Sequence, residues 1–207
     1  MPDLNVINPA KTALLLCDFE NDVVMGFCHD KTVVGRAARA AAEARKLKVP
    51  VMFVKVQWKK TYEDFPLNLN DVILAYLGSL KPTDPPPPAL LVEGTRGAEI
   101  VPELTPQADD YVFIKRRVSP FYGTSLETVL HNKGVDTVLV GGIATNMVVT
   151  AAVVDGRDRD FHMVVLKDCC AAPTKEVHEA ALAGPLPFLA RVMTSEQAFN
   201  LARGYKG

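Results

Sequence analysis

Residues 137–156, TVLVGGIATNMVVTAAVVDG, constrain the fold of this chain more than any other stretch. They begin with a short, apolar, β-branched run that is typical of a strand buried on both faces. Gly141 and Gly142 end this run, and glycine suits a sharp turn in which the backbone takes unusual angles or approaches a ligand closely. From Asn146 the apolar residues recur at helical spacing. A strand, a tight turn and a helix N-terminus therefore follow one another, which favours a ligand site above the turn.

Strand-like and helix-like segments alternate along the rest of the chain. The runs that predict strands are 12–18, 51–58, 111–115, 137–140, 162–169 and 190–193. Helices are predicted over 32–47 and 71–80, and from Thr124 (with a Thr124-x-x-Glu127 capping box), Asn146, Pro173 and Ser195. The prolines of 82–88 predict an extended surface segment. The alternation predicts a single α/β domain over residues 1–207, with a doubly wound, mainly parallel six-stranded sheet and helices on both faces.

Composition narrows the class of partner. The chain has 207 residues, 48% hydrophobic, with a formal net charge of −1, so no basic excess points to nucleic acid or to an anionic membrane surface. No segment has the pattern of a leader or the length of a membrane span, and we expect a cytoplasmic protein. The four cysteines and four histidines show no metal-ligand spacing, and no G-x-G-x-x-G follows the first strand. We therefore expect reduced thiols, no bound metal and no cofactor.

Two opposite charges stand at the ends of predicted strands. Asp18 ends the first strand and Lys115 the third, and the turn at Gly142 ends the fourth. In open parallel sheets the ligand crevice lies at the carboxyl ends of the strands, so all three would face one crevice. A lysine within about 4–6 Å would favour the charged carboxylate, whereas desolvation would oppose it. The pair is either a functional site or a structural ion pair at the sheet edge, and Trp58 nearby is either core or pocket wall.

Several segments, in this order and spacing, resemble the isochorismatase-like hydrolase superfamily, also called the cysteine hydrolases. The segments are LLLCDFENDV, EGTRGAEIVPEL, IKRRVSPFYGTSLETVL, GVDTVLVGGIATNMVVTAA, VVLKDCCAAPTKEVHEAAL and ARVMTSEQAF. The resemblance covers nearly the whole chain and implies a three-layer αβα sandwich around a parallel sheet. It also implies a small-molecule substrate and a homo-oligomer.

The resemblance also implies roles for individual residues. In the superfamily an Asp-Lys-Cys triad attacks amides, and the aspartate and lysine correspond to Asp18 and Lys115. The turn carries a non-proline cis peptide, here expected at Ile143-Ala144. Backbone N–H groups of Ala144 and Val148 would form the oxyanion hole. The candidates for lining the substrate pocket are Phe19, Trp58, Phe121, Ile143, Ala144 and Asn146.

The motif departs from the superfamily at the nucleophile. The pattern G-x-x-T-x-x-C brings Val148 to the place of the cysteine, and valine cannot form a thioester. The isochorismatases proper also lack this cysteine: there the aspartate protonates a vinyl ether and water traps the oxocarbenium ion. The nicotinamidase branch binds a metal through an Asp-x-His cluster after the second strand, which this chain lacks.

We therefore expect a hydrolase that acts on a vinyl-ether or C–N bond of a small molecule, with Asp18 as acid/base and no cysteine nucleophile. Three alternatives stay open. The first is a catalytically silent small-molecule-binding protein that keeps the fold. The second is an amidase in which Asp18 activates water directly. The third recruits Cys169 or Cys170, at the end of the next strand, as a substitute nucleophile.

Overall fold

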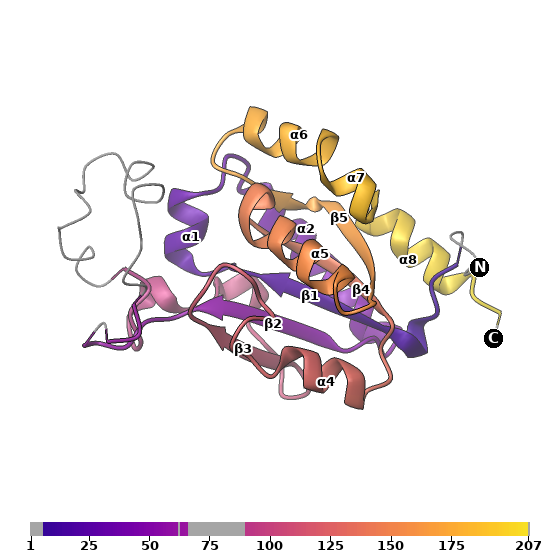
Figure 1. Ribbon diagram of the computed structural model, residues 1–207, viewed down its shortest axis with the longest axis horizontal. Helices are drawn as coiled ribbons and strands as arrows, with labels where there is room; N and C mark the ends of the chain where they lie inside the picture. Colours follow the sequence, from indigo (N-terminus) through magenta and orange to yellow (C-terminus); the bar gives the residue numbers. More distant parts are fainter. Residues whose placement is uncertain (1–5, 62, 66–89, 207) are drawn as a thin grey trace.

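Six strands form one sheet in the computed structural model, which describes residues 6–61, 63–65 and 90–206. The strands are β1 (Thr12–Cys17), β2 (Val51–Val56), β3 (Tyr111–Lys115), β4 (Thr137–Ile143), β5 (His162–Ala171) and β6 (Arg191–Met193). Their order across the sheet is β3-β2-β1-β4-β5-β6, and every pairing between them is parallel (Figure 1). The chain winds outward from β1 in both directions, so the strand order reverses between β1 and β4. The predicted doubly wound, six-stranded α/β fold is confirmed.

Helices cover both faces of this sheet (Figure 1). They are α1 (Asn21–Gly26), α2 (Thr32–Lys46), α4 (Leu126–Asn132), α5 (Thr150–Arg157), α6 (Lys175–Ala183), α7 (Leu186–Leu189) and α8 (Ser195–Arg203). The first core layer holds apolar side chains of α1, α2 and α8, and the second holds those of α4, α5, α6 and α7. The sheet therefore lies between two helical layers, as the three-layer arrangement requires.

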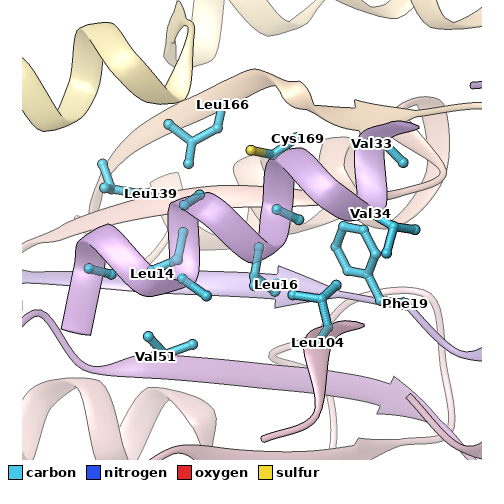
Figure 2. Packing of buried hydrophobic residues seen from close by; sticks show 14 of the residues in the cluster. Leu14, Leu16, Phe19, Val33, Val34, Val51, Leu104, Leu139, Leu166 and Cys169 are labelled. Carbon is cyan, nitrogen blue, oxygen red and sulfur yellow. The ribbon is translucent and has the colours of Figure 1, made fainter. Parts of the chain in front are cut away.

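The strands read as continuous apolar runs because both of their faces are buried. In β1, Leu14 and Leu16 point into the first core layer, under α2 (Figure 2), whereas Leu15 and Cys17 point into the second. All six residues of β1 are buried, and Asp18 is the first residue after it. The run of apolar residues therefore ends where the sheet reaches its carboxyl edge.

The predicted elements agree with the observed ones except at a few boundaries. The fourth strand continues to Ile143 instead of ending at residue 140, and the segment Thr145–Val149 forms a π-helical turn before α5. The short helices α1 and α7 were not predicted. The predicted helix over 71–80 and the proline-rich segment 82–88 lie outside the described residues.

The predicted capping box at Thr124 is wrong. The helix α4 begins at Leu126, whose backbone N–H donates to the Thr124 hydroxyl at 3.3 Å. Glu127 does not reach back to the helix start, because its carboxylate accepts a hydrogen bond from Arg159 Nε at 2.8 Å. The Glu127 side chain therefore forms a tertiary ion pair with Arg159 and does not form the helix cap that the local sequence pattern had indicated.

In the part of the chain that the structure describes, no helix has the length and apolar character needed to cross a membrane.

The close packing at the turn after β4 predicts that the stability of the fold depends strongly on Gly142. A Cβ atom at this position would lie 2.7 Å from the Cys17 carbonyl oxygen and 3.0 Å from Cys17 Cβ. We expect Gly142→Ala to lower the free energy of unfolding by about 1–3 kcal/mol, because β1 and β4 must separate to admit the methyl group. Gly26→Ala is the control, since a Cβ at Gly26 meets nothing within 4 Å. Urea denaturation measures both, and equal stabilities of the two variants would contradict the packing described here.

Candidate active site

Asp18 stands at the carboxyl edge of the sheet in an unusual backbone conformation. Its φ is 59°, in the left-handed region that only a few non-glycine residue types, aspartate among them, tolerate. Its backbone N–H still donates to the Val54 carbonyl oxygen at 2.9 Å, so the residue is held against β2. The residue is only 6% exposed. The end of β1 therefore holds a carboxylate below the molecular surface.

Lys115 provides the opposite charge. It is the last residue of β3, is 2% exposed, and places Nζ 2.9 Å from Asp18 Oδ2. Nζ also donates to the Arg117 carbonyl oxygen at 3.1 Å. The expected contact between Asp18 and Lys115 is confirmed, and it is a buried ion pair rather than an exposed one at the sheet edge.

The ionisation of Asp18 reflects two opposing effects. Burial raises its pKa because the charged form loses its hydration, whereas the charge of Lys115 and the hydrogen bond from its ammonium lower it; burial prevails and the pKa of Asp18 is raised. Asp18 Oδ1 is buried and accepts no hydrogen bond from the described residues. A buried acceptor without a donor is costly, and at a strand end it points to a ligand or water as the missing partner.

Glu20 is a second buried carboxyl group beside this pair, and sequence reasoning missed it. It is 0% exposed, and its Oε1 accepts a hydrogen bond of 2.5 Å from the backbone N–H of Val56, the last residue of β2. Oε2 is buried and has no hydrogen-bond partner among the described residues. The only sequence signal was a second acid two positions after Asp18, a spacing that places side chains together only once the backbone turn at Asp18 is known.

The turn after β4 brings a second group of polar side chains together. The peptide bond Ile143-Ala144 is cis, as expected, and the π-helical turn starts immediately after it. Thr145 is buried, and its hydroxyl lies 2.8 Å from Nδ1 of His178 on α6. The His178 ring in turn lies 5.4 Å from that of His29, measured between centroids. Burial lowers the pKa of His178, and the proximity of His29 lowers it further, which favours the neutral ring.

The candidate pocket residues are distributed over both core layers. Val148 is 1% exposed and belongs to the second layer together with Phe121. Phe19 belongs to the first layer, where Figure 2 shows its ring close to Val34 of α2. The structure therefore places Phe19 on the opposite face of the sheet from Phe121 and Val148.

The remaining candidates lie along the carboxyl edge. Ile143 and Ala144 flank the cis bond and are buried in the first layer. Trp58 is also buried, and its ring meets Phe65 edge to face, with 5.0 Å between centroids. Asn146 is exposed.

An open hollow of about 290 Å³ lies next to the end of β3. Its lining residues are Asp64, Arg116, Arg117, Tyr122 and Gly123. Asp64 forms an ion pair with Arg116. The hollow adjoins the ion pair through Arg117, whose carbonyl oxygen contacts Lys115. Among the described residues, no group of three or more histidine, cysteine, aspartate or glutamate side chains is arranged to hold a metal ion.

The fold and this edge define an α/β protein with a buried acid–lysine pair at the carboxyl ends of its strands. Residues 12–197 match the family model described as the isochorismatase domain, and the chain belongs to the isochorismatase family. It is a hydrolase of that family acting on small molecules, as the named activities of its relatives indicate.

Similar proteins cover almost the whole chain. An uncharacterized isochorismatase family protein of Escherichia coli O157:H7, YecD, is 30% identical over 94% of this chain and 97% of YecD. The ureidoacrylate amidohydrolase RutB of Methylobacterium radiotolerans is 32% identical over 98% of this chain and 83% of RutB. The solved structure of an isochorismatase family protein from Burkholderia thailandensis superposes with a TM-score of 0.80, at 25% identity, over 96% of this chain and 98% of that one.

The buried pair predicts that removal of Lys115 is costly. In Lys115→Met, Asp18 loses its counter-charge while staying buried, and we expect a loss of about 3–5 kcal/mol in the free energy of unfolding at neutral pH. The pKa of Asp18 rises further in this variant. The loss should therefore be small at acid pH, where Asp18 is protonated in both folded proteins, and grow once the pH rises above the folded-state pKa of Asp18 in the wild type.

Two further variants test this reading. Asp18→Asn combined with Lys115→Met should recover much of the stability, because no unpaired charge is then left. Lys46→Met removes an exposed partner of Glu43 and should change the stability by less than about 0.5 kcal/mol. Chemical denaturation over a pH series measures all three. A Lys115→Met cost that is independent of pH, or that persists in the double variant, would show that Lys115 contributes only packing.

Proposed function

We propose that this protein hydrolyses a small molecule by general acid–base catalysis, with Asp18 as acid/base, Lys115 as its charged partner and water as the nucleophile. The observation that carries the proposal is the buried ion pair. Lys115 binds one oxygen of Asp18 at 2.9 Å and leaves the other, Oδ1, with no protein donor. An oxygen that is held in place but not hydrogen-bonded is suited to take a proton from water or to give one to a substrate.

The electrostatics of Asp18 suit this role. A catalytic acid or base works best when its pKa lies near the working pH, and burial shifts the pKa of Asp18 upward in that direction. Lys115 limits the shift, so the carboxylate form stays accessible. An exposed aspartate would be a weaker base because its pKa would stay near 3.9.

The cysteines do not supply a nucleophile in this proposal. The apolar Val148 stands where the superfamily pattern has its cysteine, and it is packed into the second core layer. Burial raises the pKa of Cys17 well above its ordinary value and that of Cys170 to about 12. It also raises the pKa of Cys28 and of Cys169. Because the thiolate is the reactive form, none of the four is activated, and this disfavours recruitment of Cys169 or Cys170.

For a C–N bond the proposed steps balance without a covalent enzyme intermediate. Asp18 takes a proton from water as the water oxygen bonds to the carbonyl carbon. The backbone N–H groups of Ala144 and Val148 stabilise the resulting oxyanion. Asp18 then returns the proton to the departing nitrogen as the C–N bond breaks. The products are an acid and an amine.

For a vinyl ether the same carboxyl group acts first as an acid. Protonated Asp18 gives its proton to the vinyl carbon, and water adds to the resulting oxocarbenium ion while returning a proton to Asp18. The hemiketal then breaks its C–O bond, and the products are a ketone and an alcohol. The amidohydrolase activity in the name of RutB supports the C–N substrate, and the absence of a cysteine at position 148 is compatible with both.

The substrate would enter along the carboxyl edge. We assign pocket walls to Trp58, Phe121, Ile143, Ala144 and Asn146. Phe19 packs in the first core layer and fixes the backbone beside Asp18. The exposed side chain of Asn146, at the start of the π-helical turn, is the most accessible of these for a polar contact.

Asp18→Asn tests the proposal most simply, because it keeps size and hydrogen-bonding ability and removes proton transfer. We expect kcat to fall by roughly 10²–10⁴, the usual worth of a positioned acid or base. Asp136→Asn, which removes a carboxylate exposed near Lys11, is the control and should leave kcat unchanged. The assay uses isochorismate and small amides, including ureidoacrylate, as a panel. A wild-type protein inactive on every member, with ligand affinity unaffected by Asp18→Asn, would favour the silent binding protein instead.

A further inference from the structure

Three ionisable side chains converge over the end of β2, the strand between β1 and β3. Asp18 comes from β1 and Lys115 from β3, and their charged atoms meet at 2.9 Å. Glu20 reaches the same place, because its Oε1 binds the backbone N–H of Val56, the register partner of Lys115. All three side chains are more than nine-tenths buried. Two buried carboxyl groups therefore lie near one ammonium group, whose short contact is with Asp18.

The charges around Glu20 do not balance if both carboxyl groups are ionised. Lys115 contributes one positive charge, and Asp18 already takes its short contact. Lys55, on the neighbouring strand β2, does not supply a second charge to this site. Its Nζ donates to the Ala98 carbonyl oxygen at 3.0 Å and lies 4.0 Å from the Glu99 carboxylate. A second buried carboxylate would thus be left without a counter-ion, a state that folded proteins avoid by protonation.

The hydrogen bonds agree with a neutral Glu20. Oε1 accepts from the Val56 N–H, whereas Oε2 is buried and receives no donor from the described residues. A proton on Oε2 turns this unsatisfied acceptor into a donor. The site also holds an unsatisfied acceptor, Asp18 Oδ1. A protonated Glu20 thus presents a donor in place of an unsatisfied acceptor, in a site that holds a second unsatisfied acceptor.

We propose that Glu20 keeps its proton in the active protein and is a positioning residue that holds the Asp18–Lys115 pair in the ionised form that the proposed C–N hydrolysis uses. Loss of this proton adds a second negative charge beside the ion pair, which competes with Asp18 for the single ammonium group and weakens the pairing. Glu20 then sets an alkaline limit for activity. The catalytic part of this inference rests on the proposed function; the protonation of Glu20 does not.

The pH effect on stability follows from the environment of the carboxyl group. Burial raises the pKa of Glu20 well above its ordinary value, and the charge of Asp18 raises it further, while Lys115 and the Val56 N–H oppose the rise. Among the described residues, the thiol of Cys17 also lies in the field of Asp18, Lys115 and Glu20. In the unfolded chain Glu20 ionises near pH 4.3. Between that value and the folded pKa, ionisation stabilises the unfolded chain, so the protein loses stability as the pH rises.

The first experiment compares Glu20→Gln with the wild type by chemical denaturation between about pH 4 and pH 9. Glutamine keeps the acceptor for Val56 and a donor in place of the proton. We expect the two proteins to match near pH 4 and the unfolding equilibrium constant of the variant to be lower, on the order of tenfold or more, at neutral pH. Glu103→Gln, at an exposed site, is the control and should follow the wild type. A Glu20→Gln protein that is destabilised by the same factor at every pH would overturn the proposal.

The second measurement needs no variant that might fail to fold. Infrared spectroscopy of the wild type at neutral pH should show the C=O band of a protonated, buried carboxylic acid, which disappears in Glu20→Gln where that variant folds and remains in Glu103→Gln. Asp18→Asn removes a negative neighbour, so the band of Glu20 should titrate at lower pH in that variant. No such band in the wild type at any pH where it is folded would show that Glu20 is ionised.

The third measurement, the pH dependence of kcat/KM, tests whether the protonation of Glu20 affects catalysis. The wild-type kcat/KM should fall on the alkaline side, and Glu20→Gln should keep near-wild-type activity at neutral pH while losing that fall. An alkaline limb unchanged in Glu20→Gln would overturn the positioning role. If no substrate is turned over, the proposed function fails, while the denaturation and infrared measurements still decide whether Glu20 is protonated.

Discussion

The burial of one ion pair at the carboxyl edge of the sheet is the constraint on which the rest of this site depends. β1 and β3 are separated by β2, so their backbones lie roughly 9.5 Å apart, two interstrand spacings. A long cationic side chain on β3 can bridge that span to a short carboxylate on β1, which is what Lys115 does. Closing the bridge over the end of β2 excludes water from both charges. Their interaction and their desolvation are therefore both large, and the chemistry of Asp18 follows from the balance between them.

The same constraint explains why the site has no need of a thiol in our account. An ionised pair of this kind can activate water directly, provided that one carboxylate oxygen is left without a protein donor, as Asp18 Oδ1 is. Val148 is apolar and packs among residues of the second core layer. The turn after β4 keeps its cis bond and its π-helical geometry although no cysteine is present.

Much of the fold could be predicted from sequence because its strands are buried on both faces. Continuous apolar runs bounded by charge or glycine mark such strands, and parallel strands place their ends at one edge. This is why the sequence alone could place Asp18 beside Lys115, although it could not predict that both are buried. Glu20 was missed because its direction depends on the left-handed backbone at Asp18, which no hydrophobic pattern encodes. The capping box failed for a related reason, since Arg159, distant in sequence, takes the side chain of Glu127. Local sequence patterns predict local structure, but tertiary contacts can override them.

Intact-mass spectrometry during turnover is the measurement that tests the central claim most directly, namely that hydrolysis proceeds without a protein nucleophile. The wild type and Val148→Cys would each be mixed with an amide substrate and quenched in acid over a time course. Val148→Cys places a thiol at the start of the helix after β4 and should accumulate the mass of an acyl group, which shows that an intermediate would be detected. Our account predicts that the wild type keeps its unmodified mass throughout turnover. An acyl adduct on the wild type, mapped to a cysteine or to a hydroxyl such as that of Thr145, would contradict it.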